Sequence, residues 1–336
     1  MASVFSRLSA ISVLVGLVAC GAPNVTNNEA SQGKGVKVVT TFLPITLFTE
    51  AVAGDCAEVT SLIPPNLGPH DFQATPSDLA DLSGANVLVK NGLGMEEFLD
   101  DLIRSADNKD LVVIDSSSGV KTIKAAGGGH HDDHQDDHGD AHHDDDHHEG
   151  DDDHDHGHGH SHGEYDPHIW LDPVRAAQQV ENIRDGLVKA DPSCADGYKK
   201  NADQYTAKLK ELNKEFTAKL NPYSGKTFVA FHDFATYFAN RYSLKAEFLV
   251  DLPEMNPSPA DLQRVATQVK ESGLKALLSE PQEGNRSFNA LAKDLGVNIV
   301  EFNPLETGSA ESAKKPGTYF EVMRSNVNNL VQAIGD

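Results

Sequence analysis

The stretch that most constrains the fold is a long amphipathic pattern between residues 194 and 221. Its large apolar residues recur at steps of three, four or seven positions, which is the spacing of one face of an α-helix. They are Tyr198, Tyr205, Leu209, Leu212, Phe216 and Leu220. On each side of this pattern, short apolar runs alternate with helical patterns. The order predicts an α/β protein of two lobes, each with a mainly parallel sheet flanked by helices, joined by a single long rigid helix.

The sequence predicts alternating strands and helices on both sides of the long helix. Before the long helix we expect strands at 36–42, 57–63, 86–92 and 111–117, and helices at 44–54, 75–85, 95–106 and 173–188. After it we expect strands at 227–232, 245–250, 275–280 and 298–303, and helices at 234–242, 259–273, 288–296 and 319–334. The chain is therefore expected to divide into an N-terminal lobe over 36–190, a connecting helix over 191–221 and a C-terminal lobe over 222–336.

Residues 127–163 interrupt the first lobe with a run of almost nothing but histidine, aspartate and glycine. Such a segment buries no apolar surface to offset the entropy of ordering a chain, so we expect a mobile acidic loop. It contains thirteen of the sixteen histidines, a composition typical of metal binding. The net charge is −23, and it remains −10 without the thirteen acidic residues of this segment, so nucleic acid, which needs a basic face, is not expected as a partner.

The N-terminal residues are typical of an export signal. Arg7 precedes an apolar run over 10–19 that is too short to span a bilayer. The run ends in LVAC, which resembles a bacterial lipobox with Cys20 as the lipidated residue. We expect a signal peptide over 1–19, a lipid anchor at Cys20 and a flexible tether over 20–35, which place the protein on the extracytoplasmic side of the membrane. Ordinary secretory cleavage, with an incidental cysteine, is the alternative.

Two cysteines remain after Cys20, and they are Cys56 and Cys194. An even pair in an exported protein favours a disulfide. Two separate buried thiols are the alternative, because the sequence does not show that the two residues meet.

Three histidines lie outside the histidine-rich segment. His70 and His232 each closely follow an expected strand and precede a helix, and His168 lies in a proline-punctuated loop before a helix. Ligands bind at the carboxyl edge of a parallel sheet in such folds. A lone histidine of this kind is usually a loop or core residue. Three at comparable positions predict a shared ligand.

Five segments in order resemble the signature segments of the metal-binding lipoproteins that serve ABC importers. The likeness is to their zinc branch, the ZnuA-like solute-binding proteins, and it covers the chain from Val36 to the end. The segments are GPHDFQATPSD, DPHIWLDP, FHDFATYF, LLSEPQ and NPLE. The resemblance implies two α/β lobes joined by one long helix with the metal between them. It also implies a receptor that delivers Zn²⁺ to an ABC permease in the membrane. We expect the protein to be a monomer.

The resemblance places three imidazole ligands at His70, His168 and His232. For the fourth position, some relatives have an aspartate where this chain has Asn303, and another branch uses the glutamate of NPLE, which is Glu306 here. Because a carboxylate is a better zinc ligand than a neutral amide, we expect Glu306. Glu280 is the reserve candidate, in a setting that looks structural.

The expected donor set favours zinc. Three imidazoles and one carboxylate suit a tetrahedral ion. The manganese and iron members of the family exchange an imidazole for a second carboxylate, and His232 argues against them. The acidic neighbours Asp166, Asp172 and Asp233 are candidates to orient the imidazole rings.

Other classes of function are less well supported by the sequence. A zinc hydrolase typically carries the helical pattern H-E-x-x-H, which this chain lacks, so an enzyme is not expected. A surface adhesin or metal-storage lipoprotein of the same fold is the alternative to a transport receptor. In the receptor reading, the histidine-rich segment binds several zinc ions weakly and raises their local concentration near the cleft.

Overall fold

The structure, a computed structural model, describes residues 35–125, 163–253, 255–281 and 286–335. The expected signal peptide, Cys20, all of the tether but Gly35 and all of the histidine-rich segment but Gly163 lie outside the described residues. Within the described ranges, no helix combines the length and the apolar character needed to cross a membrane.

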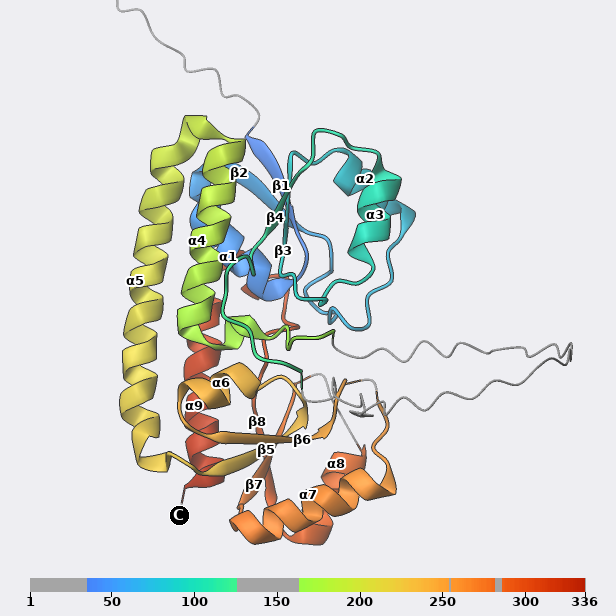
Figure 1. Cartoon of the computed structure of the whole chain (residues 1–336), viewed down its shortest axis with the longest axis vertical. Helices are drawn as coiled ribbons and strands as arrows, with labels where there is room; N and C mark the ends of the chain where they lie inside the picture. Colours follow the sequence, from blue (N-terminus) through green and yellow to red (C-terminus); the bar gives the residue numbers. More distant parts are fainter. Residues whose placement is uncertain (1–34, 126–162, 254, 282–285, 336) are drawn as a thin grey trace, which may run out of the picture. The chain divides into compact units, whose positions relative to one another are not determined.

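Four parallel strands form the first sheet, in the order β2-β1-β3-β4. They are β1 (Val36–Thr40), β2 (Ala57–Ser61), β3 (Val87–Lys90) and β4 (Val112–Asp115). Helices α1 (Leu43–Ala53) and α4 (Pro173–Ala190) cover one face of this sheet, and α2 (Pro76–Ser83) and α3 (Leu99–Ala106) cover the other (Figure 1). Because side chains alternate along a strand, Val38 packs into the core on the α1 side, while Val39 packs towards α2 and α3.

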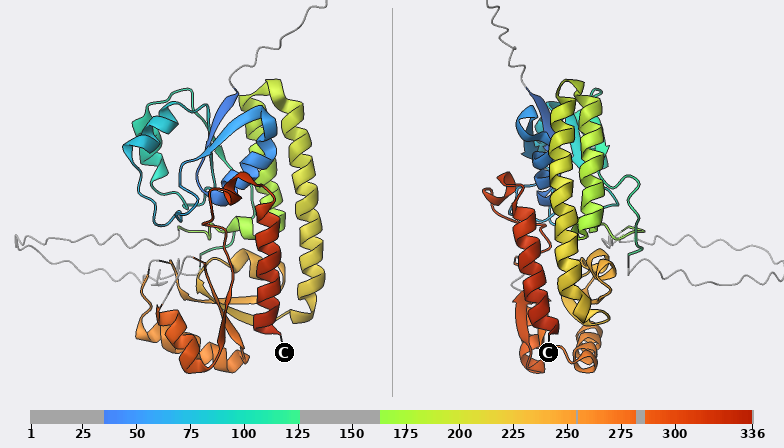
Figure 2. Two further views of the ribbon diagram at one scale, coloured as in Figure 1. Left: turned by 180° about the vertical axis from the view of Figure 1, so that it is seen from behind. Right: turned by 90° about the vertical axis from the view of Figure 1, so that its left-hand side faces the viewer.

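The second sheet repeats the arrangement, in the order β6-β5-β7-β8, and is also parallel. Its strands are β5 (Thr227–His232), β6 (Lys245–Val250), β7 (Ala276–Ser279) and β8 (Asn298–Glu301). Helices α6 (Thr236–Arg241) and α9 (Thr318–Ile334) lie on one side, and α7 (Pro259–Ser272) and α8 (Arg286–Leu295) lie on the other (Figures 1 and 2). Every residue of the central strand β5 is buried, as expected for a strand covered on both faces.

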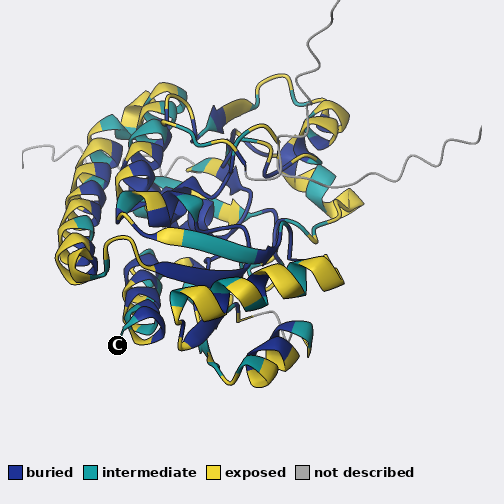
Figure 3. Ribbon diagram, turned by 60° about the horizontal axis from the view of Figure 1, so that its bottom comes forward, coloured by how far each residue is buried: buried dark blue, intermediate teal, exposed yellow. Residues whose placement is uncertain are grey.

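The long helix α5 (Ala195–Leu220) runs beside both sheets (Figure 2). Its 26 residues span about 39 Å, and it contacts α1 and α4 of the first lobe and α9 of the second. Its predicted apolar residues are buried, and Figure 3 shows buried positions gathered where helices face the sheets. Short 3₁₀ turns, η3 (Pro192–Cys194) and η4 (Asn221–Tyr223), flank it. The predicted fold class, two parallel α/β lobes joined by one long helix, is confirmed.

A disulfide joins Cys56 to Cys194. Cys56 ends the 3₁₀ turn η1 (Gly54–Cys56) directly before β2, and Cys194 directly precedes α5. The bond therefore ties an edge strand of the first sheet to the start of the connecting helix. Gly197 faces this bond so closely that an added Cβ would lie 2.8 Å from the Cys56 Sγ atom.

Helix α3 begins later than the sequence predicts, at Leu99 instead of Met95. The side chain of Glu96 accepts hydrogen bonds from the backbone amides of Asn91 (2.7 Å) and Gly92 (3.0 Å). Its carboxylate therefore holds the preceding loop, in which Gly92 has a φ of 90°. A glutamate that reaches back to its own loop resembles an ordinary helical residue in a sequence pattern, so the pattern does not locate this boundary.

Candidate metal centre

Four side chains from separate segments converge at the carboxyl ends of the two sheets. His70 lies in the loop between β2 and α2, and His168 directly precedes the 3₁₀ turn η2 (Ile169–Leu171) and α4. His232 is the last residue of β5, and Glu306 lies in the loop after β8. One donor atom from each of the four lies within 4.8 Å of all the others. Over the described part of the chain, this is the one group of three or more potential ligand side chains that meets this criterion.

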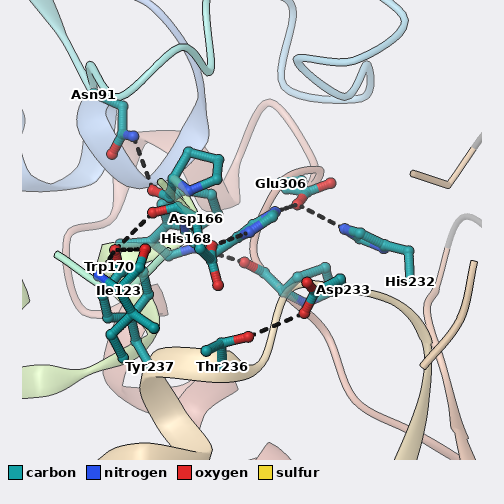
Figure 4. Close-up of polar contacts among 12 residues, drawn as sticks. Asn91, Ile123, Asp166, His168, Trp170, His232, Asp233, Thr236, Tyr237 and Glu306 are labelled. Atoms are coloured by element: carbon teal, nitrogen blue, oxygen red, sulfur yellow. Dashed lines mark hydrogen bonds and ion pairs between the residues drawn. The ribbon is translucent and has the colours of Figure 1, made fainter. Parts of the chain in front are cut away.

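The three imidazoles direct their Nε2 atoms towards one oxygen of Glu306. Figure 4 shows His168 and His232 on either side of this carboxylate. The distances to Glu306 Oε1 are 3.3 Å from His168, 3.5 Å from His232 and 3.9 Å from His70. Neighbouring ligand atoms of a tetrahedral zinc ion lie about 3.3 Å apart, given zinc–nitrogen bonds of about 2.0–2.1 Å. Two of the three distances from Glu306 Oε1 are therefore close to the donor spacing of a tetrahedral zinc site, and the four donor atoms all lie within 4.8 Å of one another.

Carboxylates fix the orientation of two of the rings. The Nδ1 atom of His168 lies 2.7 Å from Asp166 Oδ1, and the Nδ1 atom of His232 lies 2.6 Å from Glu280 Oε1. A carboxylate next to Nδ1 keeps the proton on that atom and leaves the Nε2 lone pair to face a metal. Both pairs are almost completely buried, so solvent does not compete with them.

The same carboxylates shift the pKa values of the buried rings in the protein without metal. Burial would lower the pKa of His168, but Asp166 and then Glu306 outweigh it and raise the value to about 9. Burial would likewise lower the pKa of His232, but Glu280 and Glu306 raise it well above its ordinary value. For Glu306, burial would raise the pKa, but the three imidazoles, led by His232, hold it well below the usual range. The carboxylates around these two rings therefore favour a positive charge at this place in the structure.

The structure distinguishes the candidates for the fourth position. Glu306 faces all three imidazoles, whereas the Asn303 side-chain oxygen accepts a hydrogen bond from the Leu305 amide at 2.7 Å. The backbone of Asn303 is paired with Asn326 through bonds of 2.8 and 2.7 Å. Asn303 therefore holds the turn that presents Glu306, a turn in which Leu305 has a φ of 66°. Glu280, the reserve candidate, contacts the far side of the His232 ring instead.

The three flanking acids have different roles. Asp166 alone of the three hydrogen-bonds a ring of the group. Asp172 caps α4 by accepting from the Val174 amide at 2.9 Å, and Asp233 accepts from the Thr236 hydroxyl at 3.0 Å. The contribution of Glu280 to His232 was not anticipated, because the two residues lie 48 positions apart and no local pattern joins them.

A cavity of about 120 Å³ reaches the group from one side. His70 and Glu306 line it, together with Asn66, Leu67, Gly68, Asp71, Pro253 and Thr307. His168 and His232 are fully buried, whereas the side chain of His70 is 9% exposed. The cavity therefore meets the group at its most accessible member.

Comparison with known proteins shows the family to which the chain is similar. The family model ZnuA, described as zinc-uptake complex component A, periplasmic, matches residues 38–333. Zinc-binding protein AdcA of Streptococcus pyogenes serotype M3 (strain ATCC BAA-595 / MGAS315) is 34% identical over 304 residues, covering 89% of this chain and 56% of that protein. The high-affinity zinc uptake system protein ZnuA of Bacillus subtilis (strain 168) is 31% identical over 335 residues, covering 98% of each.

Solved structures share the fold as well. Zn(II)-bound AdcA from Streptococcus pneumoniae matches with a TM-score of 0.70 at 30% identity, covering 90% of this chain and 58% of that one. The chain thus spans little more than half the length of the AdcA proteins. The family model nevertheless accounts for both lobes and the connecting helix. The resemblance seen in the sequence is confirmed, and the chain belongs to the ZnuA family.

Proposed function

We propose that this protein is an extracytoplasmic, high-affinity zinc receptor that delivers Zn²⁺ to an ABC-type importer. One observation carries the proposal: three imidazoles and one carboxylate, drawn from both lobes, bring donor atoms within 4.8 Å of one another, with Nε2 atoms 3.3–3.9 Å from Glu306 Oε1. Zinc is the cargo of this site.

The donor set supports zinc over harder cations. Imidazole nitrogen suits zinc, whereas magnesium, calcium and manganese favour sites rich in oxygen ligands. Four protein ligands also complete a tetrahedral shell, which leaves no position for the activated water of a catalytic zinc site. A closed shell supports binding and transport instead of hydrolysis.

The relatives support the transport role. The Bacillus subtilis protein is named for high-affinity zinc uptake, and it matches over nearly its full length. The family model describes the periplasmic component of a zinc-uptake complex. A receptor of this kind requires a membrane permease as its partner, and we propose that partner for this chain.

The division of the chain fits this role. We propose that the lobes comprise 36–190 and 222–336, with 191–221 as the connection between them. His70 and His168 come from the first lobe, and His232 and Glu306 come from the second. An ion held by all four ligands couples the lobes, because each lobe supplies two of the ligands and the ion binds only when both are in place.

The terminal and histidine-rich segments have roles in the same proposal. A diacylglyceryl group on Cys20 would hold the receptor at the membrane, with 20–35 as its tether. The histidine-rich segment, 127–163, would collect zinc weakly and raise its concentration near the cavity beside His70. Both roles rest on sequence composition, since these residues lie outside those that the structure describes, apart from Gly35 and Gly163.

The test is the zinc content and zinc competition titration of the mature protein, with and without residues 127–163. We expect the deletion to leave one tightly bound zinc ion and to remove several weakly bound ones. The bridge between Lys124 and Tyr165 lies outside the deleted range and should keep the chain ends together. Loss of the tight site on deletion would show that a histidine of this segment is a primary ligand. Preference for manganese over zinc in the intact protein would refute the zinc assignment.

A further inference from the structure

The short helix α6 of the second lobe contacts both ends of the first-lobe segment that carries His168. The Tyr237 hydroxyl donates to the backbone carbonyl of Asp166 at 2.7 Å. Four residues further along α6, Arg241 binds the carboxylate of Asp172. Asp166 and Asp172 bracket His168, so both ends of its segment are tied to the opposite lobe.

Tyr237 is fully buried at the junction of three segments (Figure 4). Besides donating to Asp166, its hydroxyl accepts a hydrogen bond from the Ile123 amide at 3.0 Å. The Arg175 guanidinium lies over its ring, 4.6 Å from the centroid. The phenol therefore has a single accessible geometry, and the Asp166 backbone is fixed through it. The carboxylate of the same aspartate holds the Nδ1 atom of His168.

Arg241 makes a bidentate pair with Asp172. Its Nε and Nη2 atoms each lie 2.8 Å from a different carboxylate oxygen of Asp172, which is completely buried. Arg175 from α4 also binds this carboxylate. Two parallel bonds from a planar guanidinium fix direction as well as distance. The start of α4 is therefore held at a set position relative to α6.

The opposite end of α6 leads back to the second imidazole. His232 ends β5, and α6 begins at Thr236 after a single tight turn in which the Phe234 amide bonds the His232 carbonyl at 3.0 Å. Strand β5 and helix α6 therefore carry His232 at one end and bind the segment of His168 through Tyr237 and Arg241. The two buried imidazoles belong to different lobes, yet the short turn after β5 and the contacts of α6 connect them directly.

We propose that Tyr237 and Arg241, here called the α6 clamp, are positioning residues that set the separation of His168 and His232 for zinc. This inference rests on the proposed zinc function. Neither residue contacts the ion. They act through Asp166 and Asp172, so that the two buried imidazoles are spaced for the ion before it arrives.

The test compares two tyrosine substitutions. Tyr237→Phe removes the hydroxyl that holds Asp166. Tyr205→Phe is the matched control, because its hydroxyl also donates to a backbone carbonyl, that of Pro316 at 2.9 Å, and neither residue lies in a segment that carries an imidazole. We expect Tyr237→Phe to weaken zinc binding about tenfold and to change the visible absorption bands of the Co²⁺-loaded protein. Tyr205→Phe should leave both unchanged, whatever its effect on the melting temperature.

Two further variants test whether the effect passes through His168. In a His168→Ala background, Tyr237→Phe should weaken zinc binding no further, because the ring that it positions is gone. Arg241→Lys keeps the charge but not the two-pronged geometry, and should also weaken binding. Zinc affinity within twofold of wild type in Tyr237→Phe, or an equal loss in Tyr205→Phe, overturns the clamp. Failure of the wild-type protein to bind zinc would instead overturn the proposed function.

Discussion

Glu280→Gln is the substitution that most sharply tests how the site is tuned. In the structure the Glu280 carboxylate lies 2.6 Å from His232 Nδ1, and both side chains are completely buried. The glutamine has the same shape and keeps an oxygen that can accept the Nδ1 proton. The substitution therefore removes the negative charge while leaving the packing and the hydrogen bond in place.

The expected magnitude follows from the role of that charge. A carboxylate on Nδ1 makes Nε2 a stronger donor, and removing such a partner typically costs 10–100-fold in metal affinity. That range corresponds to about 1.4–2.7 kcal/mol of binding free energy. Because no solvent screens this pair, we expect the loss to fall in the upper half of the range. The raised pKa of His232 should also fall, since burial lowers it and Glu280 is the first of the groups that oppose burial.

The assay is competition for zinc against a chelator of known affinity, with Glu301→Gln as the control. Glu301 is an exposed carboxylate at the end of β8, so its neutralisation changes the net charge equally without touching an imidazole. Unchanged zinc affinity in Glu280→Gln, or an equal loss in both variants, would refute the view that Glu280 tunes His232.

Three other outcomes are expected. Carboxylates raise the pKa of His168 to about 9, so the protonated ring contributes its full stabilisation below about pH 6.5 and loses it as the pH rises towards 9. The Tm of the zinc-free protein should therefore fall across that range. A flat Tm profile contradicts the shift. Replacing Cys56 and Cys194 together by serine should lower the free energy of unfolding by about 4–5 kcal/mol in denaturant titrations, and zinc affinity should not change. An unchanged free energy of unfolding contradicts a disulfide in solution. Cys20→Ala should leave the precursor without a lipid and unattached to the membrane. If mass spectrometry shows that the wild-type mature protein carries no acyl chain, the lipid anchor is contradicted.

Much of the fold follows from local patterns. Strands β5 and β6 have the predicted bounds. The apolar run of β5 is typical of a strand buried on both faces, whereas β6 lies at the edge of the sheet and is buried only at its end. The long helix was also recognisable, since its buried face repeats at helical spacing over many turns. The start of α3 is not recognisable in the sequence, because Glu96 binds backbone amides of its own loop instead of continuing a helix.

The ligands of the candidate site could be predicted from the sequence, but the residues that orient them could not. Residue type and family resemblance nominate His70, His168, His232 and Glu306, and the structure brings these four together. What orients them lies far away in the sequence: Glu280 reaches His232 across 48 positions, and Tyr237 reaches Asp166 across 71. The first contact depends on the pairing of β5 with β7 within one sheet, and the second depends on how the two lobes pack. No periodicity or motif encodes either of them. The preference for Glu306 over Asn303 rested on ligand chemistry, and the hydrogen bond from Leu305 to Asn303 now supports it.

The central claim is that three histidines and one glutamate hold the zinc ion. Its most direct test is the zinc affinity, measured by competition in protein lacking residues 127–163, of single alanine variants at His70, His168, His232, Glu306 and Asn303. Each histidine variant should lose more affinity than the roughly 10–100-fold expected for an orienting partner. Glu306→Ala should lose less than the histidine variants, because water can take the vacated position, and Asn303→Ala should lose least. Wild-type affinity in all three histidine variants would contradict the claim, and a greater loss in Asn303→Ala than in Glu306→Ala would contradict the fourth ligand.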